Sequence, residues 1–174
     1  MSLIADKKYF LLDTCIAEYW MDEYMQPAIS SQLTVWAGEV FEMAISEISY
    51  AELLDGAYRS KIDRVKELVG TYTQLEVSQR VLIGSAILSN VYRKKSQKTS
   101  GAGLQDKIIA ATSFIYNLPI ITADIHDFPH PFFTTRASET IVYTKKAKNH
   151  NHYITLDILT PNLKQLNYWY AQVQ

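Results

Sequence analysis

The chain has 174 residues, a formal net charge of -1 at pH 7 and a hydrophobic content of 48%. This length suffices for one buried core and is short for two, so we expect a single domain spanning residues 1–174. The balanced charge excludes a global electrostatic attraction to nucleic acid and leaves only a local basic patch for such a role. The one cysteine, Cys15, excludes an internal disulfide framework and fits a reducing cytoplasm.

Apolar runs that alternate with amphipathic patterns predict an α/β fold with a central parallel sheet. Residues 9–12 form an apolar run that ends at Asp13 and predicts a first, central strand. Residues 30–38 give no readable pattern, and Pro27 indicates the end of the helix before them. The other elements expected in this part of the chain are a helix over 16–25, a strand over 40–45 and helices over 49–58 and 62–69.

Residues 104–124 contain the clearest helix and strand. Apolar residues recur along one face of a helix, which stops at Asn117 and Pro119. The run 118–121 then predicts a short buried strand that ends near Asp124. Because the apolar stretch is interrupted, we expect no membrane span. The remaining elements expected are an extended piece over 74–77, a helix over 81–92, a β-hairpin of 140–144 and 153–158 with a basic tip, and a terminal helix over 163–170.

Four acidic residues are predicted to lie at the same edge of the sheet. Asp13 and Asp124 follow the carboxyl ends of strands, and Glu52 and Asp106 fall in the first turns of helices. Ligand sites in open α/β sheets gather outside this edge. Carboxylates that converge there repel one another, and a divalent cation such as Mg²⁺ or Mn²⁺ relieves the repulsion. Such a cation also polarises a phosphoryl oxygen and activates water, as phosphodiester hydrolysis requires.

Simpler roles remain open for each of these acids. Glu52 closes the sequence Ser49-Tyr-Ala-Glu52, which matches a capping box at a helix N-terminus. Asp106 suits the positive end of its helix dipole, and Asp124 suits a turn. On local sequence alone, capping is the better interpretation of Glu52, and complementing the helix dipole is the better interpretation of Asp106. Only the four acids taken together favour a metal site.

Four motifs resemble those of PIN-domain proteins, and specifically the VapC-like toxins of type II toxin–antitoxin pairs. Together they cover roughly residues 9–130 in the expected order, and residues 131–174 extend beyond the compact family pattern as a β-hairpin and a short helix. The resemblance implies a PIN-like α/β domain with a central parallel sheet flanked by helices. The motifs are Phe10-Leu-Leu-Asp13-Thr-Cys-Ile16, Ile45-Ser-Glu-Ile-Ser-Tyr-Ala-Glu52-Leu-Leu-Asp-Gly56, Leu104-Gln-Asp106-Lys-Ile-Ile-Ala-Ala111 and Ile121-Thr-Ala-Asp124-Ile-His-Asp-Phe128.

The resemblance also implies a function. It makes the chain a Mg²⁺- or Mn²⁺-dependent endoribonuclease, with RNA as substrate and a cognate antitoxin as protein partner. Two alternatives are a housekeeping RNA- or DNA-processing PIN nuclease without an antitoxin, and a non-catalytic PIN-fold interaction module. By the same resemblance, the catalytic and metal-binding acids are Asp13, Glu52, Asp106 and Asp124, with Thr14 and Thr122 as polar neighbours and Asp127 as an alternative for the last acid.

Two kinds of surface are also expected. Aromatic residues in the early helices, Tyr19, Trp20 and Tyr24, are predicted to mediate a homodimer and the antitoxin contact, because aromatic residues are enriched at interface cores. The basic runs 93–98 and 145–148 are most often solvated surface in proteins. They suit a nucleic-acid backbone if they flank the acids.

Overall fold

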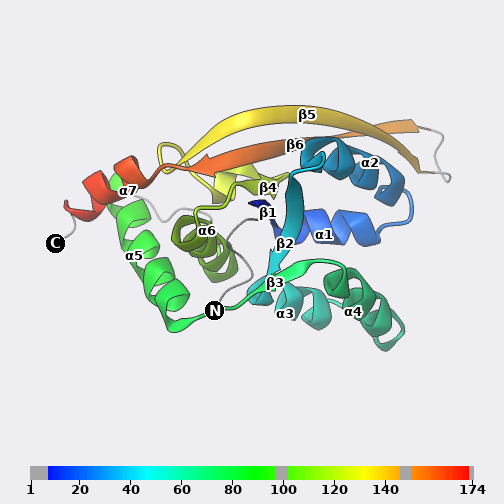
Figure 1. Cartoon of the computed structure of the whole chain (residues 1–174), viewed down its shortest axis with the longest axis horizontal. Helices are drawn as coiled ribbons and strands as arrows, with labels where there is room; N and C mark the ends of the chain where they lie inside the picture. Colours follow the sequence, from blue (N-terminus) through cyan, green and yellow to red (C-terminus); the bar gives the residue numbers. More distant parts are fainter. Residues whose placement is uncertain (1–7, 97–101, 146–149, 173–174) are drawn as a thin grey trace.

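The structure, a computed structural model, describes residues 8–96, 102–145 and 150–172 (Figure 1). Its centre is a six-stranded sheet in the order β3-β2-β1-β4-β6-β5. The first four strands in this order run parallel, and β6 pairs antiparallel with both β4 and β5. The strands are β1 (Lys8–Leu12), β2 (Phe41–Ser46), β3 (Thr73–Leu75), β4 (Ile120–Thr122), β5 (Phe133–Lys145) and β6 (His150–Pro161). This confirms the predicted α/β fold with a mostly parallel central sheet and a C-terminal hairpin.

Helices connect the parallel strands and cover both faces of the sheet (Figure 1). None of the helices in the described residues is long and apolar enough to cross a lipid bilayer. The helices are α1 (Thr14–Met21), α2 (Gln26–Ala37), α3 (Glu47–Asp55), α4 (Ile62–Gly70), α5 (Gln79–Ser96), α6 (Leu104–Tyr116) and α7 (Leu163–Tyr170), with short 3-10 helices η1 (Arg59–Lys61) and η2 (Ile125–Asp127).

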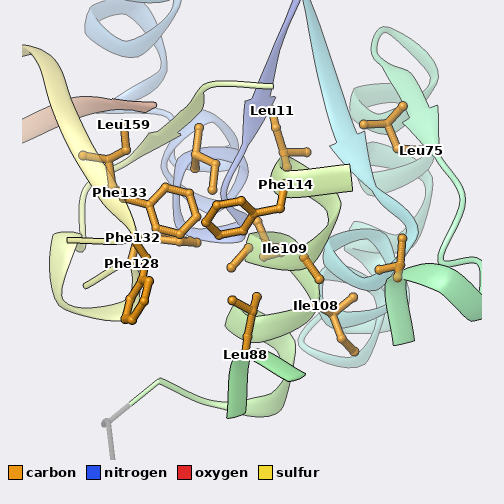
Figure 2. Close-up of a cluster of buried hydrophobic side chains, with 14 of the residues drawn as sticks. Leu11, Leu75, Leu88, Ile108, Ile109, Phe114, Phe128, Phe132, Phe133 and Leu159 are labelled. Atoms are coloured by element: carbon orange, nitrogen blue, oxygen red, sulfur yellow. The ribbon is translucent and has the colours of Figure 1, made fainter. Parts of the chain in front are cut away.

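The alternation of side chains along β1 separates two parts of the core. Leu11 points into the layer that contains α5 and α6, where it meets Ile109 and Phe114 (Figure 2). Phe10 and Leu12 point to the other face, which α1 and α2 cover. Because β1 is buried on both faces, its sequence is a continuous apolar run rather than an alternating one.

One prediction for the early helices was wrong. Residues 30–38, which show no readable pattern, belong mostly to helix α2, and Pro27 lies in the first turn of that helix. Proline is tolerated there because its missing N–H has no partner inside the helix. Ile29 and Leu33, four residues apart, are buried on the inner face of α2. The preceding helix, α1, is correspondingly shorter than predicted and ends at Met21.

The hairpin is longer than predicted. Strands β5 and β6 pair from Phe133↔Pro161 to Lys145↔His150, with an irregularity between Thr135 and Ala137. The exposed residues at the start of β5 hide the strand in the sequence, because they lack the alternation of a half-buried strand. Residues 146–149 of the predicted tip lie outside the described residues, as do positions 97 and 98 of the first basic run.

Candidate functional site

Asp13 lies where β1 gives way to α1. Its N–H donates to the Ile121 carbonyl at 3.0 Å, so β1 and β4 stay paired up to this residue. The side chain is 5% exposed. Its carboxylate accepts hydrogen bonds from the Thr14 N–H at 2.8 Å, the Thr122 hydroxyl at 2.6 Å and the Cys15 thiol at 3.1 Å. Burial nevertheless raises the pKa of Asp13, and the charge of Asp106 adds to the rise.

Glu52 is not part of a capping box, so that interpretation was wrong. Helix α3 begins at Glu47, and its N-cap is Ser46, whose hydroxyl accepts from the Ile48 N–H. Ser49 lies inside the helix, which places Glu52 in the second turn rather than the first. The helix end is therefore satisfied without Glu52, and its side chain is available for another contact.

The Glu52 carboxylate reaches the end of β1 instead. The Thr14 hydroxyl donates to its Oε2 at 2.6 Å. Burial raises the pKa of Glu52, and the charges of Asp106 and Asp13 raise it further. Two of the four predicted acids are thus coupled to each other and to a third.

Asp106 has both of the roles that were considered for its position. It occupies the first turn of α6, where its Oδ2 accepts the Gly103 N–H at 2.6 Å. This bond satisfies one of the free N–H groups at the helix start. At the same time, its charge raises the pKa of Asp13 and Glu52, so capping does not remove it from the acidic group.

Asp124 and Asp127 bracket the 3-10 helix η2. Asp124 is exposed and caps this helix, because its Oδ1 accepts the His126 N–H at 3.0 Å. Asp127 is half-buried, and its pKa is raised to about 6 by burial and by the charges of Asp106, Asp124 and Asp13. Asp127 is therefore electrostatically coupled to three of the four predicted acids, which with Glu52 and Asp127 itself form what we call the acidic cluster.

Two threonines tie these acids to the sheet. Thr122 donates its hydroxyl to Asp13 and accepts the Asp124 N–H at 2.9 Å. Thr14 gives its N–H to Asp13 and its hydroxyl to Glu52. The two residues predicted as polar neighbours therefore contact three of the four predicted acids.

Asp157 is a further buried acid next to the site that was not among the predicted residues. This residue lies on β6 directly opposite Thr122 and is only 9% exposed. The available signal was an acidic residue inside the buried run 156–159. Its place beside Thr122 follows from the register of β6 against β4, which the sequence does not reveal.

The arrangement concentrates negative charge at this edge of the sheet. None of the described lysine or arginine side chains forms a salt bridge with these acids. No group of three or more His, Cys, Asp or Glu side chains in the described residues is already arranged to hold a metal ion. Their carboxylates face hydroxyl and amide donors instead. Cys15 offers no nucleophile, because burial and the neighbouring Asp13 raise the pKa of its thiol.

A family model for the PIN domain matches residues 10–130. The chain belongs to the PIN-domain family. The matched region contains all the acids and threonines predicted from the resemblance, and it ends before β5. In this PIN-domain protein, strands β5 and β6 and helix α7 thus lie outside the part that the family shares.

Several solved structures have a fold similar to that of this PIN-domain protein. A chain from a toxin–antitoxin complex of Klebsiella pneumoniae is 25% identical, with a TM-score of 0.55 over 70% of this chain and 92% of the other. A chain of VapBC2 from Rickettsia felis, bound to a DNA fragment from its promoter, is 20% identical, with a TM-score of 0.58 over 71% and 93%. A chain of FitAcB from Neisseria gonorrhoeae is 22% identical, with a TM-score of 0.55 over 68% and 90%. No curated protein matches the chain.

Proposed function

We propose that this PIN-domain protein is a divalent-metal-dependent endoribonuclease and the toxin of a toxin–antitoxin pair. The observation that carries the proposal is the meeting of acids at the carboxyl edge of the sheet: Thr14 bonds both Asp13 and Glu52, and the charge of Asp106 acts on both of them. Like charges held together in this way cost free energy unless a cation offsets them. Perturbed carboxylates in such a place are typical of functional sites.

The donor set fits a hard divalent cation. Carboxylate and hydroxyl oxygens are the ligands that Mg²⁺ and Mn²⁺ prefer. In Glu52, Asp106 and Asp124, the hydrogen bonds described above use one carboxylate oxygen each, which leaves the other for a cation or its water shell. Asp13, Asp106 and Asp124 would hold the ion, directly or through water, with Asp127 as the alternative to Asp124. When bound, such an ion polarises a phosphoryl oxygen and lowers the pKa of water.

Glu52 would orient the water that attacks phosphorus, or join a second metal site. Its raised pKa makes it a better proton acceptor than an ordinary carboxylate. Thr14 fixes the Glu52 carboxylate through its hydroxyl, and Thr122 does the same for Asp13. The attack would be an in-line displacement of the leaving oxygen.

The toxin assignment draws on solved structures of similar fold, because one is a toxin–antitoxin complex and another is VapBC2 bound to a DNA fragment from its promoter. We infer that an antitoxin and a second copy both contact the early helices. Tyr19 and Trp20 are half-buried on α1, and Tyr24 is half-buried in the turn between α1 and α2. Trp20 also borders a cavity of about 260 Å³ together with Leu33 and Tyr72. Light scattering over a wide range of protein concentration tests the homodimer, and a monomer throughout would contradict it.

A cleavage assay tests the nuclease. Single-stranded RNA and single-stranded DNA are incubated with the protein in Mg²⁺, and in parallel with chelator. We expect RNA to be cut only in Mg²⁺, with Asp106→Asn inactive in the same preparation. Equal cutting of RNA and DNA would favour a processing nuclease. No cutting and no Mg²⁺ binding by calorimetry would favour an interaction module.

A further inference from the structure

The C-terminal hairpin extends beyond the edge of the sheet that bears the acids. Strand β4 ends at Thr122, which pairs with Asp157 of β6. Because β6 runs antiparallel to β4, residues 150–156 lie past the carboxyl end of β4 and pair only with β5. Figure 1 shows this part of the hairpin reaching beyond β4 and over α2. The projecting segment therefore begins next to the acidic site.

One face of the projecting segment is on the same side of the sheet as α6 and the buried acids. Ile120 and Leu159 point into the core beneath α6. Thr122 and Asp157 share that side, because side chains alternate along a strand. The same alternation brings further residues of β6 and their partners on β5 to this face, which we call the hairpin platform. The platform consists of Thr140, Val142, Thr144, Asn151, Tyr153 and Thr155.

The two faces of the hairpin differ in what covers them. On the opposite face, Ile141, Ile154 and Leu156 pack into the core beneath α2. On the platform every residue is exposed, including Tyr153 at 67% and Val142 at 49%. The hairpin thus packs one face against the core and exposes the ring of Tyr153 directly opposite Val142 on the other face.

The rest of the platform is polar and ordered. The hydroxyls of Thr140 and Thr155 lie 3.0 Å apart across the strands, and the Thr144 hydroxyl donates to the side-chain Oδ1 of Asn151 at 3.2 Å. Hydroxyl and amide groups of this kind can exchange bonds with base edges and ribose hydroxyls, while an exposed ring offers a stacking surface for an unpaired base.

The charge of the segment suits a polyanion. Residues 140–156 include Lys145, Lys146 and Lys148 and contain no Asp or Glu, in a chain whose net charge is -1. Glu139, just before the segment, is paired with Leu156 and so belongs to the opposite face. A nuclease site built from carboxylates repels its substrate, so the positive charge of this sequence segment adds an attraction that the site lacks.

We propose that the hairpin platform binds single-stranded RNA next to the acidic site, with Tyr153 stacked on an unpaired base. The proposal rests on the proposed nuclease function and adds the surface that positions the substrate. The platform lies outside the region that the PIN-family model matches, so it distinguishes this chain from a compact PIN domain.

The test measures RNA binding separately from chemistry. Fluorescence anisotropy follows the full chain as it binds a labelled single-stranded oligouridine in chelator, where no metal-dependent cleavage occurs. We expect Tyr153→Ala to weaken binding about tenfold, the effect of losing one base stack, and Tyr153→Phe to bind as the parent does. Thr155→Glu should also weaken binding, because it places a negative charge on the platform.

The matched control is Tyr168→Ala, which removes a ring that is 60% exposed on α7, at the other end of the molecule (Figure 1). Its binding should equal that of the parent. Equal affinities for Tyr153→Ala and Tyr168→Ala would overturn the platform, as would a parent chain that binds no RNA in chelator. If the parent cuts RNA in Mg²⁺ with the same KM as Tyr153→Ala, the nuclease proposal stands and the platform alone fails.

Discussion

The Thr122 hydroxyl donates a hydrogen bond of 2.6 Å to the carboxylate of Asp13, and both side chains are buried. Thr122 is the last residue of β4 and Asp13 directly follows its parallel neighbour β1, so this bond joins the ends of the two strands at the site itself. The same hydroxyl accepts the Asp124 N–H. Thr122 therefore positions the side chain of Asp13 and the backbone of Asp124.

Replacing Thr122 by valine keeps the shape of the side chain and removes both bonds. We expect Thr122→Val to lower the free energy of unfolding by about 1–3 kcal/mol, because a buried carboxylate loses its strongest donor. The Thr122 bond lowers the pKa of Asp13, so its loss should cost more at pH 7 than at pH 4, where Asp13 is more fully protonated. Urea unfolding at the two pH values measures this difference. Thr134→Val, at an exposed site on β5, is the control and should change little.

Glu52→Gln separates charge from structure. The helix is capped by Ser46, so the variant should fold as the parent does, and the Thr14 hydroxyl can still donate to the amide oxygen. We expect RNA cleavage to fall by about 10²-fold or more, because an amide cannot accept the proton of an attacking water. Initial rates in Mg²⁺ measure this loss. Glu67→Gln, at an exposed position on α4, should retain full activity. A Glu52→Gln variant as active as the parent would leave Glu52 without a catalytic role.

The positions of the acids at strand ends could be predicted from the sequence, because they depend on the local pattern alone. A buried apolar run that ends at an acid, as at Asp13, predicts both the strand and the edge where its side chain lies. The start of α3 was misplaced because Ser46 and Ser49 are both suitable caps, and the choice between them depends on how far β2 remains paired with β1. The position of Asp157 beside Thr122 could not be predicted, because it depends on the register of β6 against β4, two strands that lie far apart in the sequence.

Metal binding should stabilise the parent chain through the acidic cluster. A cation that binds only the folded state adds about 2.7 kcal/mol at a hundredfold excess over Kd. For a domain of this size the melting midpoint should then rise by roughly 5–10 °C, at about 2–4 °C per kcal/mol. Calorimetry with and without Mn²⁺ measures the rise.

Asp106→Asn should reduce this increment and abolish Mg²⁺-dependent cleavage. The asparagine oxygen can still accept the Gly103 N–H, so the cap on α6 survives while the charge is lost. Asp55→Asn, at an exposed position at the end of α3, should leave the increment unchanged. Equal increments in the parent and in Asp106→Asn would mean that Asp106 does not share a cation with its neighbours.

The raised pKa of Asp127 predicts how stability depends on pH in the absence of metal. With a pKa of about 6, folded Asp127 binds a proton over a range where the unfolded chain, with its ordinary value of 3.8, has lost it. The folded state then binds more protons, so this group lowers the free energy of unfolding as pH rises from about 4 to 6. Asp127→Asn should remove that fall and raise stability at pH 7, as urea unfolding across this range would measure. Superimposable curves for variant and parent would contradict the coupling.

Protons and the cation should compete for the same carboxylates. If Asp127 and its neighbours hold Mn²⁺, the stabilisation that Mn²⁺ gives the parent should shrink as pH falls below about 6, because protonated Asp127 no longer attracts the ion. In Asp127→Asn the remaining increment at pH 7.5 should be smaller, and its dependence on pH near 6 should be weaker. Melting midpoints at a fixed Mn²⁺ concentration from pH 5 to 7.5 measure both effects. An increment that does not change with pH in the parent would place the ion away from Asp127 and favour Asp124 as the last acid of the site.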